Sequence, residues 1–256
     1  MTDSPLKVSL ESNGQLLELK LNRPKANIID AEMISALDRA LSEHLGNAGL
    51  KAVLLSAEGP HFSFGASVEE HLPGRCADML KSLHGLILRI FQSSVPVMVA
   101  VRGQCLGGGL EVAAAGHLIF AAPDAKFGQP EIKLGVFAPA ASCLLPIRIG
   151  QARAEDLLLS GRTIDAEEAH RFGLINTIED DPEAAARAWF DEHLAPSSAS
   201  SLGVAVAAAR GEMYAQVQRR LGEVESLYLD KLMKTADAVE GLTAFVDRRP
   251  PEWENG

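Results

Sequence analysis

Cysteine is scarce in this sequence, and the little there is excludes two classes of protein. The 256-residue chain has three cysteines, Cys76, Cys105 and Cys143, which stand far apart. An odd number without paired spacing excludes a complete disulfide framework and any CxxC metal signature. The seven histidines show neither HxxxH nor HExxH spacing. We therefore expect no metal site, and we expect the cysteines to be small buried side chains.

Long apolar runs and an excess of basic residues are lacking as well. No run approaches the roughly 18–20 apolar residues that a membrane span needs. The first five residues, Met-Thr-Asp-Ser-Pro, have neither the basic start nor the apolar stretch of a signal peptide. The 24 Lys and Arg are outnumbered by 34 Asp and Glu, so the net charge is -10, which disfavours binding to a phosphate backbone. These features predict a cytoplasmic enzyme without a nucleic-acid or membrane partner.

Length and hydrophobic content indicate a large α/β domain. Hydrophobic residues make up 47% of the chain, which suffices for a sizeable core. Asn13-Gly14 is a hairpin signal between two strands, and Asp30 can cap the helix that follows. The predicted strands are 7–10, 16–21, 52–56, 97–101, 118–121 and a short one near 174–178. The predicted helices are roughly 31–45, 79–91, 112–115, 138–149, 152–160, 166–172 and 182–194.

The segment 196–201 has the composition of a linker. It reads Pro-Ser-Ser-Ala-Ser-Ser, and two or three predicted helices follow it. We therefore predict a mixed α/β core over residues 1–196 and a helical C-terminal subdomain over residues 197–256. Apolar stripes in that subdomain could pack within one chain or between chains.

The triple glycine at 107–109 is the most informative motif. It stands in the run Leu106-Gly107-Gly108-Gly109-Leu110-Glu111. Glycine at a helix start lets a ligand approach the backbone, and the first helical N–H groups, which lack intrahelical partners, suit a developing negative charge. The same glycines also suit close packing of a helix on a strand, so the motif alone leaves both interpretations open. No GxGxxG or GxxxxGK[ST] pattern is present, which excludes those nucleotide motifs.

Two further segments favour a chemical role for this region. The run 62–67 (Phe-Ser-Phe-Gly-Ala-Ser) follows a predicted strand and offers a second glycine turn with free N–H groups. Glu131, in the run 127–131, lies 20 residues after Glu111. Two N–H groups aimed at one carbonyl oxygen form an oxyanion hole. Two carboxyl groups beside one water can act as general acid and base, although either glutamate taken alone is more often a solvated surface residue.

Taken in order and spacing, these segments resemble the crotonase (enoyl-CoA hydratase/isomerase) superfamily. The resemblance covers about residues 7–250 and rests on the runs 21–27, 62–67, 106–111, 127–131 and 240–249. It implies an α/β fold of the crotonase type, a spiral of ββα units with a helical C-terminal subdomain that assists oligomerisation and covers the active site. It also implies a homotrimer or homohexamer.

The resemblance implies roles for individual residues. The amides of Ala66 and Gly108 match the two N–H groups that hold the thioester carbonyl oxygen, and Glu111 and Glu131 match the glutamates that hold a single water. The substrate is then an acyl-CoA thioester, and no separate cofactor is required. Contacts with this ester are expected from Lys25, Ala26, Phe64, Gly65, Ser67, Val68, Gly107, Phe137 and Arg248. For Lys25 and Arg248 the alternative is an ordinary solvated cation, and for the two phenylalanines it is core packing.

The retained pair of glutamates favours a hydratase within this family. Many enoyl-CoA hydratases follow the second glutamate with a glycine-rich run ending in Gln-Arg, whereas this chain has the run 134–146, so one wall of the pocket must be built differently. Ser67 also replaces the usual Asp. The runs 64–71 and 136–142 resemble the cyclohexa-1,5-diene-1-carbonyl-CoA hydratases of anaerobic benzoyl-CoA degradation. That resemblance implies 1,4-addition of water to a cyclic dienoyl-CoA.

Two alternatives are also compatible with the sequence. Within the enzyme class, the alternative is a general short- or medium-chain enoyl-CoA hydratase. Outside it, the chain could be a non-catalytic acyl-CoA-binding or RNA-binding relative. The two glutamates argue against the binding protein, and the acidic balance argues against RNA.

Overall fold

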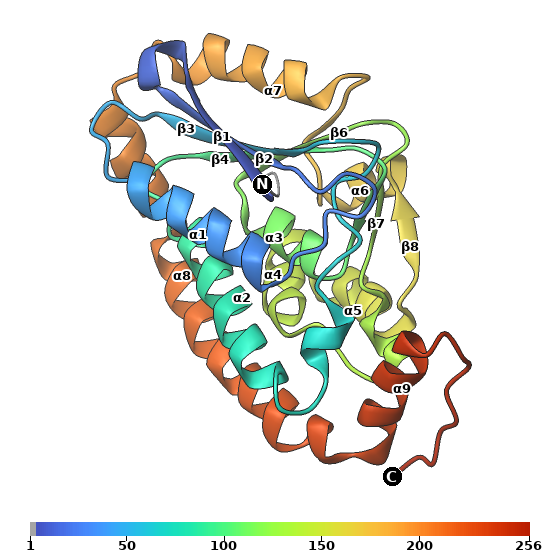
Figure 1. Cartoon of the computed structure of the whole chain (residues 1–256). Coiled ribbons are helices and arrows are strands. Elements are labelled where there is room, and N and C mark those ends of the chain that lie inside the picture. The colour runs from blue at the N-terminus through green and yellow to red at the C-terminus, as the bar shows by residue number, and fades with distance from the viewer. Residues whose placement is uncertain (1–3) are drawn as a thin grey trace.

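A six-stranded sheet forms one end of the molecule in the computed structural model, which describes residues 4–256 (Figure 1). The strand order is β1-β2-β3-β4-β6-β9. The hairpin β1–β2 is antiparallel and every later pair is parallel. The bounds are β1 Leu6–Glu11, β2 Leu16–Leu21, β3 Ala52–Ala57, β4 Val97–Val101, β6 Leu118–Ala121 and β9 Thr177–Ile178. The expectation about the first five residues falls partly on residues 1–3, outside the described residues.

Side chains on the two faces of this sheet alternate because β-strands have a period of two residues. In β3, Leu54 faces a cluster completed by α7 (Pro182–Trp189), whereas Val53 and Leu55 face the main core. Figure 1 shows α7 on the outer face of the sheet, and α1 (Ala31–His44) and α3 (Gly108–Ala115) on the other face. Burial on both faces explains why the parallel strands β3 and β4 are continuously apolar.

The helices begin and end close to their capping signals. Asp30 caps α1 by accepting a hydrogen bond from the Met33 amide, and Asp165, Asp181, Ser198 and Thr235 cap four later helices similarly. The bounds are α1 Ala31–His44, α2 Cys76–Phe91, α3 Gly108–Ala115, α4 Pro139–Ile149, α5 Gln151–Ser160, α6 Ala166–Phe172, α7 Pro182–Trp189, α8 Ala199–Asp230 and α9 Ala236–Val246.

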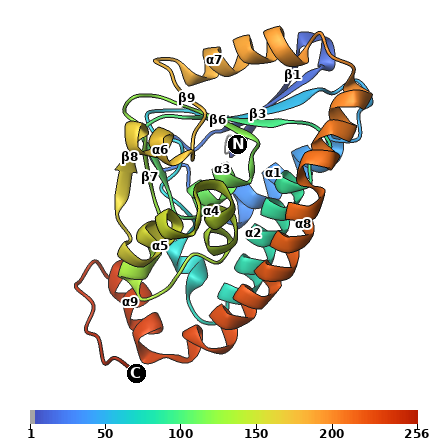
Figure 2. The same cartoon turned by 180° about the vertical axis from the view of Figure 1, so that it is seen from behind.

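A layer of helices lies below the sheet and surrounds α3. The long helix α8 runs beside α2 in both views (Figures 1 and 2) and also packs against α4. Its buried residues, Val217, Leu221, Val224 and Tyr228, belong to the same hydrophobic cluster as α1, α2 and the sheet. Short helical turns η2 (Val68–His71) and η3 (Pro130–Leu134) both contact α9.

A second, three-stranded sheet positions the triple glycine. It consists of β5 (Gln104–Leu106), β7 (Lys126–Gly128) and β8 (Thr163–Asp165), in that order. The strand β5 ends one residue before Gly107, and the Gly107 amide donates to the Gly128 carbonyl oxygen at 3.0 Å. The sheet therefore fixes the glycine loop beside the turn that carries Glu131.

The structure confirms the predicted fold class and most elements, and it corrects two expectations. The segment 196–201 is not a linker throughout, because Ser198 is the N-cap of α8 and the helix starts at Ala199. Gly108 and Gly109 lie inside α3, which starts four residues earlier than predicted. The division into domains at residue 197 stays a prediction.

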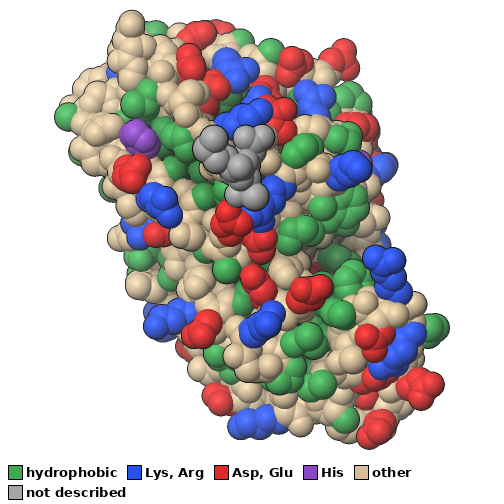
Figure 3. Space-filling view, viewed as in Figure 1, with side chains coloured by type: hydrophobic (Ala, Val, Ile, Leu, Met, Phe, Trp, Pro, Cys, Tyr) green, Lys and Arg blue, Asp and Glu red, His purple; other side chains and the backbone are tan. Residues whose placement is uncertain are grey.

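The surface carries charges of both signs. Figure 3 shows Lys and Arg side chains interspersed with Asp and Glu side chains over one face, with hydrophobic side chains among them. Among residues 4–256, no helix is both long enough and apolar enough to cross a membrane.

Gly103, at the entrance to β5, yields a test of this architecture. Its φ of +54° favours glycine, and a methyl group there would overlap the Pro60 carbonyl oxygen. We expect Gly103→Ala to lower the free energy of unfolding by about 1 kcal/mol or more. Gly85, on the exposed side of α2 with open space around it, is the matched control, and Gly85→Ala should raise stability by roughly 0.5–1 kcal/mol. Denaturant unfolding measures the free energy of unfolding of both variants. An equal change in the two variants would contradict the requirement for glycine at position 103.

Candidate active site

Two glycine turns meet at the end of β5. Gly65 has a φ of +115° and Gly107 a φ of +50°, conformations that side chains rarely adopt. A Cβ placed on Gly65 would lie 3.2 Å from the Leu106 carbonyl oxygen. The Gly65 amide donates to Ser63 Oγ at 3.1 Å, and the Gly65 carbonyl accepts from the Ile29 amide at 2.9 Å. Glycine at both turns is what allows the two backbones to approach.

The amides of Ala66 and Gly108 lie side by side across this contact. A Cβ placed on Gly108 would lie 3.0 Å from the Ala66 nitrogen. Gly108 is the first residue of α3, where an N–H has no intrahelical acceptor. Within residues 4–256 neither amide donates a hydrogen bond. The two N–H groups are therefore available to one shared acceptor, which is the requirement for an oxyanion hole.

Glu111 is held at the start of α4. It lies in the first turn of α3 and is 3% exposed. Its Oε1 accepts a hydrogen bond from the Ala141 amide at 2.8 Å. Pro139 is the first residue of α4, so the free N–H groups of that helix point at the carboxyl group. The run 134–146, which departs from the usual family pattern, thus supplies a helix N-terminus that binds Glu111.

Glu131 lies in η3, against the glycine loop. A Cβ on Gly107 would come within 2.6 Å of Glu131 Oε1, so only glycine leaves room for this carboxyl group. The Gln129 side-chain amide, oriented to donate, places its nitrogen 3.1 and 3.0 Å from the two carboxyl oxygens. Glu131 is thus held from one side by the amide and borders the oxyanion hole on the other.

The two carboxyl groups favour holding one proton between them. Burial raises the pKa of Glu131, and the negative charge of Glu111 raises it further, to about 8. Burial also raises the pKa of Glu111, whereas the Ala141 amide and the charge of His84 oppose that shift. Ionising two neighbouring carboxyl groups at once costs free energy, because their negative charges repel. At neutral pH one group is therefore protonated and the other ionised, so the pair offers both an acid and a base.

The structure brings several of the expected substrate contacts to this cluster. The Phe64 amide donates to the Ala26 carbonyl oxygen at 2.9 Å, which joins the run 21–27 to the Gly65 turn. Ser67 is the N-cap of η2, and Val68 packs against the main core. Phe64 is 44% exposed, with its ring edge-on to His61.

The remaining expected contacts lie at the margins. Phe137 packs edge-on against Tyr228, with ring centroids 5.2 Å apart. Lys25 is exposed beside Ala26, and Arg248 is exposed two residues after the end of α9. Within residues 4–256, neither cation forms an ion pair. These assignments of substrate contacts stay predictions.

Four residues of the site had no role in the sequence interpretation. They are His84, Gln129, Ala141 and Tyr228. Gln129 stood within a recognised run, and Pro139 is a helix-start signal that could have identified the Ala141 amide. Nothing local marks His84 or Tyr228, since each is one polar residue in an apolar helical stripe. Across the described residues, no group of three or more His, Cys, Asp or Glu side chains is arranged to hold a metal ion.

Comparison with known proteins gives consistent matches over nearly the whole chain. A family model described as enoyl-CoA hydratase/isomerase matches residues 11–256. The chain is 66% identical over 252 residues to a cyclohexa-1,5-dienecarbonyl-CoA hydratase of Thauera aromatica, covering 98% of both chains. It is 30% identical over 256 residues to a carnitinyl-CoA dehydratase of Proteus mirabilis, covering 96% of this chain and 97% of that one.

Solved structures agree with these matches. A crystal structure of an enoyl-CoA hydratase/isomerase from Pseudoalteromonas atlantica superposes with a TM-score of 0.83 at 30% identity, covering 97% of this chain and 99% of that one. An enoyl-CoA hydratase from Bacillus halodurans, at 24% identity and a TM-score of 0.86, shares the fold.

The raised pKa of Glu131 predicts how stability depends on pH. A carboxyl group whose pKa is higher in the folded state contributes stability below its unfolded pKa, and this contribution is lost as pH rises through about 8. Glu131→Gln replaces the group with a neutral one of the same shape. Its free energy of unfolding relative to the wild type should therefore rise by a few kcal/mol between about pH 5 and about pH 9. Glu155→Gln, on an exposed position of α5, is the control, and a pH-independent difference for Glu131→Gln would contradict the assignment.

Proposed function

The chain belongs to the enoyl-CoA hydratase/isomerase family, and from this we propose that it adds water 1,4 across cyclohexa-1,5-diene-1-carbonyl-CoA. The product is 6-hydroxycyclohex-1-ene-1-carbonyl-CoA. The proposal is carried by the 66% identity, over 98% of both chains, to a hydratase named for this substrate. The paired, buried glutamates beside two free amides supply the chemistry that the reaction requires.

The reaction begins with polarisation of the thioester. In our proposal the carbonyl oxygen accepts hydrogen bonds from the Ala66 and Gly108 amides. This withdraws electrons from the conjugated ring and makes the carbon β to the carbonyl electrophilic. When water attacks that carbon, negative charge spreads over a dienolate and concentrates on the carbonyl oxygen, where the two N–H groups stabilise it by several kcal/mol.

The glutamate pair accepts one proton and donates another during the reaction. The ionised carboxylate removes a proton from the attacking water as the C–O bond forms. The protonated carboxyl group then delivers its proton to the far end of the diene, the carbon γ to the carbonyl, as the dienolate collapses. The two glutamates exchange protonation states over one turnover. Because the two glutamates titrate as a coupled unit, the two apparent pKa values belong to the pair and not to either residue alone.

The remaining contacts of the coenzyme A ester are part of the proposal. Lys25 and Arg248 are exposed cations without an ion pair in the described chain, and we assign them to the phosphates of coenzyme A. Ala26, Gly65, Ser67, Val68 and Gly107 line the path from these cations to the oxyanion hole. Phe64 and Phe137 flank the ring. The reaction uses backbone amides, carboxyl groups and water, so the proposal includes no cofactor beyond the coenzyme A of the substrate.

We further propose a cytoplasmic homotrimer or homohexamer acting in anaerobic aromatic degradation. Large apolar side chains are exposed around α9 and η3, namely Ile132, Phe245, Val246 and Trp253, and burial between subunits would remove them from water. Multi-angle light scattering should give three or six times the chain mass of 27.3 kDa, and a monomer would contradict the proposal.

Substitution of either glutamate tests the chemistry. Glu111→Gln and Glu131→Gln should each lower kcat on the cyclic diene by roughly 10²–10⁴, the span typical of lost acid–base catalysis, while ester binding persists. The exposed Glu155→Gln variant should keep the wild-type rate. Near-normal hydration by both site variants would overturn the two-glutamate assignment.

The position of the added hydrogen tests the 1,4 course. For turnover in D₂O, NMR of the product should show deuterium on the carbon γ to the thioester carbonyl. Crotonyl-CoA, assayed in parallel, should be a much poorer substrate than the cyclic diene. Hydration of crotonyl-CoA with none of the cyclic diene would instead indicate a general short-chain hydratase.

A further inference from the structure

One buried hydroxyl near the carboxyl pair has no partner. Tyr228, on α8, is fully buried, yet its Oη forms no hydrogen bond. A buried polar group left without a partner normally costs free energy, and most such groups in proteins are paired. Phenylalanine would fill the same space without that cost. Because no group of the described chain pairs with it, the Tyr228 hydroxyl is available to a molecule bound beside it.

The position of Tyr228 points to that partner. Its ring packs edge-on against Phe137, with centroids 5.2 Å apart and planes at 66°. Phe137 lies between η3, which carries Glu131, and α4, whose N-terminus binds Glu111. Burial raises the pKa of the Tyr228 hydroxyl, and the negative charges of Glu131 and Glu111 raise it further. The Tyr228 hydroxyl is therefore neutral and able to donate a hydrogen bond, and the charges of both glutamates act on it.

A second unpartnered atom lies on the same side of the site. His84, on α2, is 3% exposed; its Nδ1 pairs with Glu225, whereas its Nε2 is buried without a partner. Glu225 and Tyr228 are three residues apart on α8 and so share a face of the helix. The charge of His84 acts on Glu111. Two buried polar atoms without partners, His84 Nε2 and Tyr228 Oη, thus lie on the packed helices α2 and α8.

We propose that Tyr228 is a further catalytic residue, whose hydroxyl donates a hydrogen bond to the oxygen atom that adds to the ring. This inference rests on the proposed hydration. A water molecule between the glutamates can donate its two hydrogens to their carboxyl oxygens. If one lone pair accepts from Tyr228, a single lone pair remains for attack. The hydroxyl then directs that lone pair at the β carbon, and in the reverse reaction it holds the departing oxygen.

Tyr228→Phe isolates the hydroxyl, because the ring and its packing on Phe137 remain. We expect kcat for the cyclic diene to fall about tenfold or more, as for a lost hydrogen bond in the transition state, with KM changed by less than about threefold. The melting temperature should stay equal or rise, because the variant removes an unpaired buried group. Tyr214→Phe, the other tyrosine of the chain and also on α8, is the control and should match the wild type in both.

Three results would overturn the inference that the Tyr228 hydroxyl takes part in catalysis. Wild-type kcat in Tyr228→Phe would overturn the inference, whether or not the melting temperature falls. Loss of rate in Tyr214→Phe as well would assign the effect to α8 rather than to the hydroxyl and would also overturn it. A wild-type protein that hydrates no enoyl-CoA ester would overturn the proposed function and, with it, this inference.

A product complex tests the contact independently of kinetics and of how the variant folds. In a crystal structure of the wild-type protein with the hydroxylated product, Tyr228 Oη should lie within about 3.2 Å of the product hydroxyl oxygen. A tyrosine hydroxyl directed away from that oxygen would overturn the proposal.

Discussion

The repulsion between two buried carboxyl groups is the constraint on which the site depends. The negative charge of Glu111 adds to burial in raising the pKa of Glu131, so one carboxyl group of the pair keeps its proton at neutral pH. The surroundings of the two groups differ: the negative charge of Glu111 adds to burial in raising the pKa of Glu131, whereas the Ala141 amide and His84 oppose the effect of burial on the pKa of Glu111. Acid and base chemistry at neutral pH follows from this asymmetry, without a group of unusual intrinsic reactivity.

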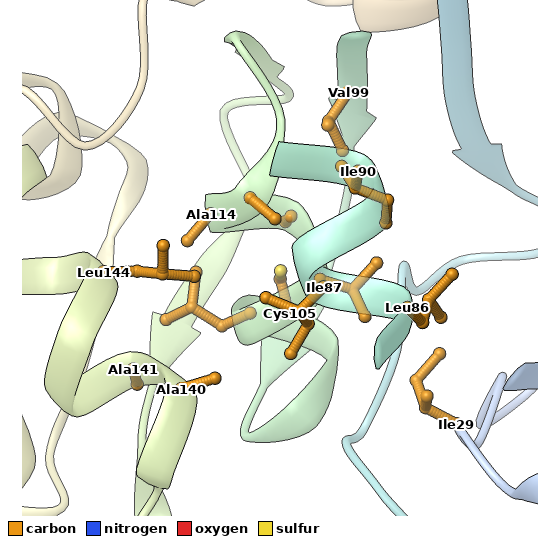
Figure 4. Close-up of a cluster of buried hydrophobic side chains, with 14 of the residues drawn as sticks. Ile29, Leu86, Ile87, Ile90, Val99, Cys105, Ala114, Ala140, Ala141 and Leu144 are labelled. Carbon is orange, nitrogen blue, oxygen red and sulfur yellow. The ribbon is translucent and has the colours of Figure 1, made fainter. Parts of the chain in front are cut away.

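The backbone around the pair meets a second constraint, that of close approach. Gly107 leaves room for the Glu131 carboxyl group, and Gly108 leaves room for Ala66, so the oxyanion hole and the proton pair share one short segment. This segment is anchored by β5 and begins α3, whose helix packs into the apolar core with α2 and α4. Figure 4 shows that contact, with Ile87 and Ile90 of α2 near Ala114 and with Ala140 and Ala141 at the start of α4. The packed core directly behind the site fixes the positions of the amides and carboxyl groups relative to one another.

Much of this could be predicted from the sequence where the signal is local. The hairpin at Asn13-Gly14 and the strand Val97–Val101 follow from turn chemistry and apolar runs. The three-residue strands β5, β7 and β8 are too short to show a period, so the sheet beneath the glycine loop was missed. The serine-rich run before α8 looks like a linker because a capping serine and a flexible serine have the same composition. The roles of Tyr228 and His84 depend on the packing of α8 against α2 and α4, which no local sequence pattern predicts.

Titration of the Glu131 carboxyl group by ¹³C NMR in the free protein measures the electrostatic coupling of the two glutamates directly. We expect a midpoint near pH 8 in the wild type, and a clearly lower midpoint in Glu111→Gln, where the neighbouring negative charge is absent. A wild-type midpoint at the ordinary glutamate value of about 4.3, or one that Glu111→Gln leaves unchanged, would contradict the coupling from which the chemistry follows.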